Sequence, residues 1–278
     1  MMFKDEGLNN DHKGMNFDEG CKQQYIENYM RPSNCYKNVF NEDERKELTE
    51  YMFRKTKYWR TSSTGNLFFN GNFRELVSEI VYPKLKDLIP KDEIDWDLVE
   101  TVAGNFFHTP HQYGVHTDMP EVSNTFDSNS MVYRSLLIPM YLLGPEDCKI
   151  HMIYYDQRVV DNGCTLDYGP YSSTTHYRSF VDYTEIDNVH TLEGPSTIDP
   201  TKDMPEEEYI KAGLDKAPSP IERYHGLSVE NSYEWVPGDV HTFDTAQIHS
   251  STLGKPKFKT KAGLRISLIT RRDYVNYK

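Results

Sequence analysis

Hydrophobic positions change their spacing about a third of the way along the chain. Between residues 41 and 88 they recur at helical spacing, which predicts two helices, one beginning after Asn41 and one over 73–88. Asn41 and Glu44 have the spacing of a capping box, in which each side chain satisfies a backbone N–H at the start of the helix. Pro83 falls inside the second helix and is expected to kink or split it.

From residue 97 onward the hydrophobic residues form short runs of strand length, separated by turn residues. Helices followed by many short strands predict a mainly β protein, with a helical flank on a sandwich or open barrel. The polar stretch 161–225 is too long for an ordinary connection and predicts an insertion, and residues 1–24 predict a flexible arm before a single domain over 25–278. The predicted strands cover 98–108, 135–143, 150–160, 227–229, 233–236, 240–243 and 264–270.

Composition narrows the class of protein. Of the 278 residues 37% are hydrophobic and 13% aromatic, which is typical of a folded chain. The formal net charge of −12 disfavours a nucleic-acid partner, because an acidic surface repels a phosphate backbone. The largely apolar run 136–143 is shorter than the roughly 20 residues of a membrane span, so no membrane partner is expected.

Two further features predict a cytoplasmic location. The first residues contain no apolar stretch of the kind that forms a signal peptide. The four cysteines are scattered without a C-x-x-C pair, which is typical of reduced thiols and not of a disulfide framework or a zinc knuckle. They are Cys21, Cys35, Cys148 and Cys164.

A set of potential metal ligands lies in the β region. His116 and Asp118 are two residues apart, and residues i and i+2 of a strand point to the same side, so both can reach one ion. His249 could complete a site of two histidines and one carboxylate, which leaves coordination positions open. Arg265 lies within an apolar strand, where a cation is costly to bury unless it meets an anion, and Ser267 faces the same side.

These motifs resemble the Fe(II)- and 2-oxoglutarate-dependent dioxygenase superfamily, over roughly residues 36–160 and 226–272. The resemblance implies a double-stranded β-helix (jelly-roll, cupin-like) core with N-terminal helices. It implies Fe(II) held by His116, Asp118 and His249, with 2-oxoglutarate and O₂ as co-substrates. Arg265 and Ser267 would then grip the distal carboxylate of 2-oxoglutarate. The implied activity is hydroxylation of a C–H bond with release of succinate and CO₂, on a small-molecule, amino-acid or peptide substrate.

Within the superfamily the prolyl-hydroxylase-like branch is the most similar. Its pattern places a Tyr three residues before the first ligand, here Tyr113, and an Arg and a Tyr on the next strand, here Arg134 and Tyr141. The resemblance implies that Tyr141 helps to bind the 2-oxoglutarate carboxylate. Tyr113 and Arg134 are candidate substrate contacts, with packing and a surface ion pair as the alternative roles. The chain departs from the pattern at Phe107, where a Tyr is common, and in the longer gap between the second His and the Arg.

Other interpretations remain open on the sequence. Arg265 and Arg271, with the basic run 255–272, also resemble oxidative demethylases of alkylated nucleic acid. A metal-binding β-sandwich without redox chemistry, such as an isomerase or a binding module, would use the same ligands. His241 is a rival to His249 as the distal ligand, and ligand types alone do not choose between iron and other transition metals.

Overall fold

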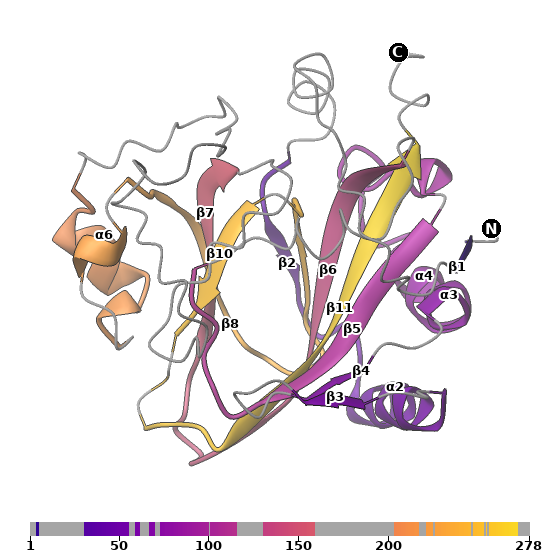
Figure 1. The fold of residues 1–278 in the computed structure, drawn as a ribbon, viewed down its shortest axis with the longest axis horizontal. Coiled ribbons are helices and arrows are strands. Elements are labelled where there is room, and N and C mark those ends of the chain that lie inside the picture. The colour runs from indigo at the N-terminus through magenta and orange to yellow at the C-terminus, as the bar shows by residue number, and fades with distance from the viewer. Residues whose placement is uncertain are drawn as a thin grey trace.

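Figure 1 shows the fold of the chain in a computed structural model. The residues that the structure describes are 4–5, 31–55, 59–61, 67–69, 73–99, 101–115, 130–158, 203–216, 221–224, 226–245, 247–252, 254 and 256–271.

The larger of two sheets carries most of the chain. Its strands follow the order β2-β9-β6-β11-β5-β4-β3, and the short β1 pairs with β5 in parallel. All other pairings in this sheet are antiparallel. The strands are β1 (Lys4–Asp5), β2 (Asn34–Tyr36), β3 (Trp59–Thr61), β4 (Leu67–Phe69), β5 (Thr101–Thr109), β6 (Ser130–Leu143), β9 (Val240–Phe243) and β11 (Thr260–Arg271).

The smaller sheet has the order β10-β7-β8 and is also antiparallel. Its strands are β7 (His151–Arg158), β8 (Val229–Glu234) and β10 (Gln247–Ser251). After β8 the chain returns to the larger sheet for β9, crosses to the smaller sheet for β10, and comes back for β11. This alternation between two facing antiparallel sheets is a jelly roll, so the predicted mainly β fold is confirmed.

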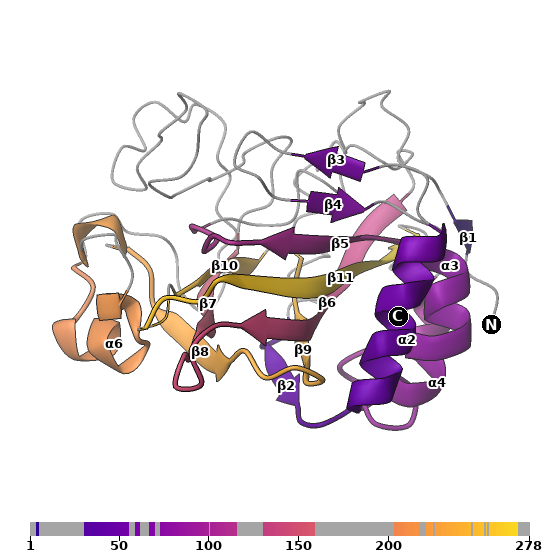
Figure 2. The ribbon, with the colours of Figure 1, turned by 90° about the horizontal axis from the view of Figure 1, so that it is seen from below.

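Helices cover the outer face of the larger sheet (Figure 2). They are α2 (Glu42–Lys55) and the consecutive turns α3 (Phe73–Leu76), η1 (Val77–Val81) and α4 (Tyr82–Leu85). Asn41 and Glu44 each accept a hydrogen bond from the other's backbone N–H, so the capping box is confirmed. The wide π turn η1 ends just before Pro83, which lies in the first turn of α4. Val81 and Tyr82 keep α-helical dihedral angles, so the chain is not split at Pro83, and the expected disturbance takes the form of a π turn.

Three hydrophobic clusters define the layers. The helix-side core joins the helices to the larger sheet and includes Leu48, Val77, Leu136 and Leu264. The inter-sheet core lies between the two sheets and consists of Phe107, Leu137, Cys148, Ile150, Met152, Tyr154, Trp235, Phe243 and Phe258. A third cluster joins the outer side of the smaller sheet to α6 (Glu206–Lys211), η4 (Leu214–Lys216) and η5 (Ile221–Tyr224).

Most predicted strands are confirmed, with shifted ends. Residues 227–229 and 233–236 were expected as two strands, but β8 is one strand over Val229–Glu234. The strands β2 and β10 and the helix α6 are not apparent from the hydrophobic pattern. Residues 1–3, 6–24 and 159–202, which include most of the predicted arm and much of the predicted insertion, lie outside the described residues. No helix in the described ranges has both the length and the apolar character needed to cross a membrane.

Candidate functional site

His249 occupies the interior of the jelly roll. It lies on β10 with 3% of its surface exposed, and its ring contacts those of Tyr154 and Phe243 in the inter-sheet core, at centroid distances of 6.1 and 4.9 Å. The neighbouring Ile248 packs on the opposite side, in the cluster with α6, as the alternation of a strand requires. His249 therefore points between the sheets.

The Nδ1 atom of His249 lies 2.8 Å from the backbone oxygen of Gln247. A carbonyl oxygen can only accept, so Nδ1 carries the proton in this contact and the lone pair is on Nε2. Metal-bound histidines are oriented in this way, with the second ring nitrogen donating to a carbonyl or carboxylate. The residue fits the role of a metal ligand.

The other two predicted ligands, His116 and Asp118, lie outside the described residues. The chain leading to them does lie beside β10. The backbone N–H of Tyr113 donates to Ser251 Oγ at 2.9 Å, and the backbone N–H of Ser251 donates to the backbone oxygen of Tyr113 at 3.0 Å. Ser251 is two residues from His249 on the same strand. The segment that precedes His116 is thus attached to the strand that carries the third predicted ligand.

Arg265 and Ser267 also point between the sheets. Their neighbours Leu264, Ile266 and Leu268 belong to the helix-side core, so alternation directs the intervening side chains to the other face. Arg265 is 9% exposed and Ser267 is fully buried. Ser267 Oγ has no hydrogen-bond partner within the described part of the chain. Three of the predicted site residues thus converge on the interior.

Lys261 is a buried cation that the sequence analysis did not single out. It is fully buried, and its Nζ donates to Ser251 Oγ at 2.8 Å. The same nitrogen lies 4.9 to 5.8 Å from the ring centroids of Tyr113, Trp235 and Phe258. Burial lowers the pKa of Lys261 to about 7. No carboxylate among the described residues pairs with it. Strand parity could have found this residue, because Lys261 and Arg265 share one face of β11.

Aromatic rings separate the two cationic positions of β11. Gly263 lies between them, and a Cβ atom there would come within 2.5 Å of Phe107 Cζ and 2.9 Å of Trp235 Cη2. The glycine is required because these rings pass directly over the backbone. Tyr113, the predicted substrate residue, packs edge-on against Phe107 at 5.4 Å. Lys261 and Arg265 are therefore distinct anchoring points within the interior.

Tyr141 lies on the other face of the larger sheet. It packs against the helix-side core and its ring lies 5.9 Å from that of His108. Burial raises the pKa of the Tyr141 phenol. The structure does not bring Tyr141 together with Arg265, although the resemblance assigns both to one carboxylate.

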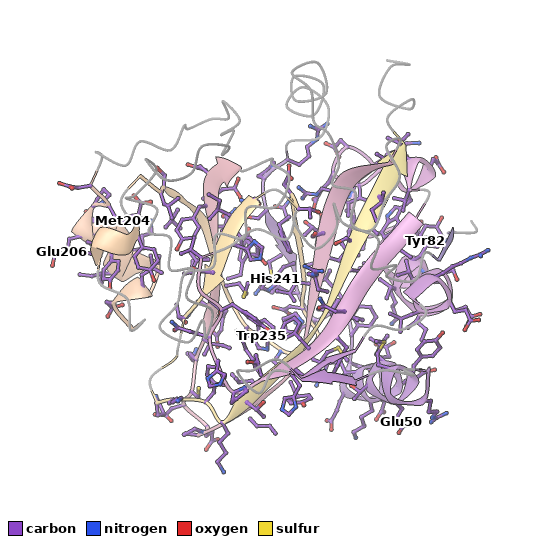
Figure 3. All side chains as sticks on the ribbon, in the orientation of Figure 1. Glu50, Tyr82, Met204, Glu206, Trp235 and His241 are labelled. Atoms are coloured by element: carbon purple, nitrogen blue, oxygen red, sulfur yellow. The ribbon has the colours of Figure 1, made fainter. Side chains whose placement is uncertain are left out.

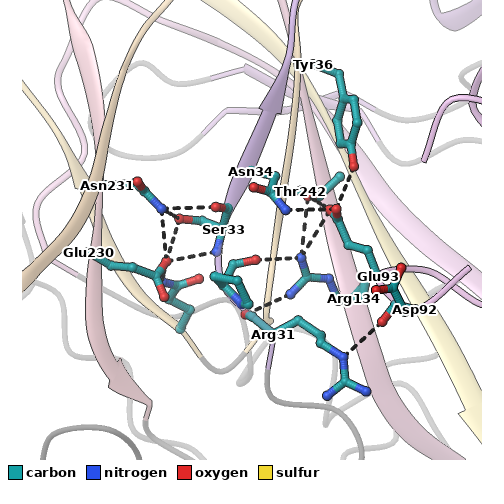
Figure 4. Close-up of polar contacts among 12 residues, drawn as sticks. Arg31, Ser33, Asn34, Tyr36, Asp92, Glu93, Arg134, Glu230, Asn231 and Thr242 are labelled. Atoms are coloured by element: carbon teal, nitrogen blue, oxygen red, sulfur yellow. Dashed lines mark hydrogen bonds and ion pairs between the residues drawn. The ribbon is translucent and has the colours of Figure 1, made fainter. Parts of the chain in front are cut away.

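Arg134 also faces the helical side, in a buried polar network (Figure 4). Its guanidinium donates to the backbone oxygens of Arg31 and Pro32, each at 3.0 Å, and lies 3.5 Å from the Glu93 carboxylate. Thr242 hydrogen-bonds to the same carboxylate. The side chain is fully buried, and these contacts give it a structural role far from the predicted substrate position between the sheets.

His241, the rival for the distal ligand, is also buried between the sheets, as Figure 3 shows with Trp235. Its Nδ1 lies 3.1 Å from the hydroxyl of Tyr154. Burial lowers the pKa of His241 to about 3, so the ring is neutral at neutral pH. The structure thus holds two buried histidines in the interior, on the successive strands β9 and β10.

In the described part of the basic run 255–272, the cations do not form one exposed stripe. Lys261 and Arg265 are buried within the jelly roll, while Lys257 and Lys259 are exposed. A continuous phosphate-binding surface needs its cations in solvent, so this arrangement disfavours the nucleic-acid alternative.

Comparisons with known proteins are limited to structure. No protein-family model matches the chain, and no curated protein matches it. Among solved structures it is similar to EvdO2 from Micromonospora carbonacea var. aurantiaca complexed with 2-oxoglutarate, at 12% identity, 93% coverage of both chains and a TM-score of 0.41. A prolyl-4-hydroxylase of Pseudomonas putida is 10% identical over 89% of this chain and 96% of its own, with a TM-score of 0.40.

A third similar structure is the epimerase SnoN in complex with Fe³⁺, alpha ketoglutarate and nogalamycin RO, at 9% identity, 91% and 84% coverage and a TM-score of 0.41. The names of these neighbours include a prolyl-4-hydroxylase and an epimerase, so their reaction types differ. With TM-scores this low, the fold assignment depends on the strand order and register of the chain itself and not on these similarities.

Proposed function

We propose that the protein is an Fe(II)- and 2-oxoglutarate-dependent dioxygenase. It would hydroxylate a C–H bond of a small-molecule, amino-acid or peptide substrate and release succinate and CO₂. The observation that carries the proposal is the position of His249, which is buried between the sheets with Nδ1 held by the Gln247 carbonyl. This orientation presents Nε2 as a ligand atom in the interior of a jelly roll.

His116, Asp118 and His249 would hold the iron, as a site of two histidines and one carboxylate with open positions. Iron, 2-oxoglutarate and O₂ together would supply the oxidising chemistry. The protein's own contribution is to hold the co-substrate and to keep water out. The rings of Tyr154 and Phe243 beside His249 provide an apolar lining for that purpose.

Arg265 and Ser267 would bind the distal carboxylate of 2-oxoglutarate. A guanidinium can donate two parallel hydrogen bonds to a carboxylate, and the Ser267 hydroxyl projects from the same face of β11. Lys261 is the second cation on that face, and as a buried ammonium without a described carboxylate partner it would also favour an anionic ligand. Arg265 is assigned to the co-substrate because its neighbour Ser267 adds a hydroxyl donor to the same position.

The proposal is tested by anaerobic visible absorption of the purified protein with Fe(II), before and after addition of 2-oxoglutarate. Chelation of the keto acid to iron should produce a weak charge-transfer band in the wild type. The band should be lost in His249→Ala and Asp118→Ala. It should persist in His108→Ala, a matched control, because His108 contacts Tyr141 on the helix-side face. Bound iron without such a band would remove the dioxygenase proposal.

A titration of the same band with 2-oxoglutarate shows which of the two residues, Arg265 or Lys261, binds the distal carboxylate. Arg265→Ala should weaken 2-oxoglutarate binding by roughly 30-fold, since truncating one partner of a buried charge pair costs about 2 kcal/mol or more. Lys261→Met should change it by less than about threefold if Arg265 is the anchor. If Lys261→Met weakens binding more than Arg265→Ala does, Lys261 is the residue that binds the distal carboxylate, and the dioxygenase assignment is unchanged.

A further inference from the structure

A second cluster of potential metal ligands consists of residues other than the predicted iron ligands. Cys35 on β2, Asp239 just before β9 and His241 on β9 each offer a ligand atom, and these atoms all lie within 4.8 Å of one another. Cys35 and His241 are direct partners in the β2–β9 ladder. Directly opposed residues of an antiparallel pair project to the same face, so the proximity is a consequence of the strand register.

His241 has an unsatisfied ring nitrogen. Its Nδ1 contacts the Tyr154 hydroxyl, but Nε2 is buried and has no hydrogen-bond partner among the residues that the structure describes. Buried polar atoms are nearly always satisfied, so an orphaned imidazole nitrogen calls for an explanation. In the tautomer in which Nδ1–H donates to the Tyr154 hydroxyl, Nε2 carries a lone pair, which is the form that a metal ligand requires.

Asp239 already holds a cation. Lys37 Nζ lies 2.8 Å from Oδ2, and the Asn38 N–H donates to Oδ1 at 2.9 Å. The Cys35 thiol contacts the same Oδ2 at 3.7 Å. The side chain of Lys37 is 54% exposed whereas that of Asp239 is 1% exposed, so the ammonium can move into solvent while the carboxylate stays in place. A metal ion can therefore replace the Lys37 ammonium at Asp239 Oδ2.

The charges balance if a divalent ion replaces Lys37. With a neutral thiol, a neutral imidazole, the Asp239 carboxylate and the Lys37 ammonium, the cluster is neutral. When a divalent ion binds, Cys35 releases its proton to solvent and the Lys37 ammonium leaves. The cluster is then neutral again, because the thiolate and the carboxylate balance the charge of the ion. Burial raises the pKa of the Cys35 thiol to about 11, so the ion must displace that proton, which makes binding stronger at higher pH.

We propose that Cys35, Asp239 and His241 form a binding site for a borderline-soft divalent metal ion of the Zn²⁺ type, with a set of ligands different from that of the predicted iron centre. Thiolate, imidazole and carboxylate together are the ligand types that Zn²⁺ takes in proteins, and a fourth position is open to water. The ion would tie the edge strand β2 to β9. This metal site goes beyond the proposed dioxygenase function and does not depend on it.

The test uses Co²⁺ as a spectroscopic probe on the metal-free full-length protein. Co²⁺ bound by a thiolate gives a near-ultraviolet charge-transfer band, whereas Co²⁺ at the predicted iron centre has no sulfur ligand and gives none. The band should appear in the wild type and in His249→Ala, and it should be lost in Cys35→Ser and His241→Ala. Cys148→Ser is the matched control, because Cys148 is also a free thiol but belongs to the inter-sheet core.

Lys37→Ala provides a test that keeps all three ligands and therefore does not depend on whether the ligand variants fold. Removing the competing ammonium should tighten Co²⁺ binding by about tenfold or more. A purely structural role for the cluster would not produce tighter binding. Zn²⁺ should displace Co²⁺ from the site and raise the thermal unfolding midpoint in the wild type but not in Cys35→Ser.

Three results would overturn the site: no thiolate band in the folded wild type at saturating Co²⁺, a band that survives Cys35→Ser, or binding that Lys37→Ala leaves unchanged or weakens. The outcome is distinguishable from that of the dioxygenase test. The keto-acid band depends on His249 and needs no thiol, so either proposal can fail while the other stands.

Discussion

The two faces of the larger sheet use buried polar groups in opposite ways. On the helix-side face the buried charge of Arg134 meets the carboxylate of Glu93 and two backbone oxygens. On the inner face the buried charge of Lys261 meets a serine hydroxyl and three aromatic rings, with no carboxylate among the described residues. The same sheet thus carries a completed ion pair on one side and an uncompensated cation on the other.

This difference indicates a structural role for the buried charge on the helix-side face and a ligand-binding role for the one on the inner face. The Arg134 guanidinium meets a carboxylate and backbone oxygens of the protein itself and needs no ligand, and these contacts fix β2, β6 and the loop of Glu93 together. A buried cation without a counter-charge is unfavourable by itself and becomes favourable when an anion enters. Arg265 lies on the same inner face, and His249 of the smaller sheet also points between the sheets, so the anionic co-substrate is expected there and not on the helix-side face.

The largest expected effect comes from breaking the completed pair. Glu93→Ala should lower the free energy of unfolding by about 3–5 kcal/mol, because it leaves the guanidinium of Arg134 buried without its carboxylate. Urea unfolding followed by circular dichroism measures this. The exposed Glu42→Ala on α2 is the control and should change stability by less than about 0.5 kcal/mol. A loss below about 1 kcal/mol for Glu93→Ala would mean that the pair is not the structural contact described.

A smaller effect, set by pH, is expected at Lys261. Its pKa is about 7 in the folded protein and 10.5 when unperturbed, so the unfolded state binds an additional proton between these values. The free energy of unfolding should therefore rise with pH from about 7 to about 10.5, by at most about 1.4 kcal/mol per pH unit from this group. Lys261→Met should remove that slope, which is measured as the difference between the two proteins at pH 7, 8 and 9.

The control for this experiment is Lys259→Met, because Lys259 is exposed and its substitution should leave the slope unchanged. An anion held at Lys261 would favour the charged ammonium and flatten the wild-type slope, so the same measurement with 2-oxoglutarate reports on the inner face. Parallel slopes for the wild type and Lys261→Met would contradict the burial of an uncompensated cation.

The smallest expected effect concerns the helical layer that covers the outer face. Asn41→Ala removes the side chain that accepts the Glu44 N–H at the start of α2, and should lower the free energy of unfolding by about 1 kcal/mol. Glu47→Ala, at an exposed position within the same helix, should have almost no effect. Equal losses in the two variants, measured by thermal unfolding, would show that the cap does not stabilise the helix.

The sequence determined the local features of the fold. The capping box at Asn41 and the alternation of β11 both depend on residues close together in the chain. Local backbone sterics and hydrogen bonding fix such features, so the pattern of residues is sufficient to predict them. The inward direction of Arg265 follows from the same alternation.

Only the tertiary structure decided which face the residues of β6 occupy. Arg134 and Tyr141 are seven positions apart, so a regular strand would place them on opposite faces. The register with β11 shifts between Ala262 and Gly263, where one additional residue of β6 is accommodated, and both side chains lie on the helical side. The sequence does not show a bulge, and a shift of one residue reverses the face of every side chain beyond it.

The tertiary structure likewise brought together Cys35 and His241, and Lys261 and Ser251. The first pair is separated by about two hundred residues and meets through the β2–β9 register, which depends on how the edge strand docks. The second pair depends on the distance between the two sheets. The sequence specified which residues can do chemistry and in which order they occur, and the packing of the sheets decided which of them meet, because strand register and sheet separation are set by contacts across the whole core.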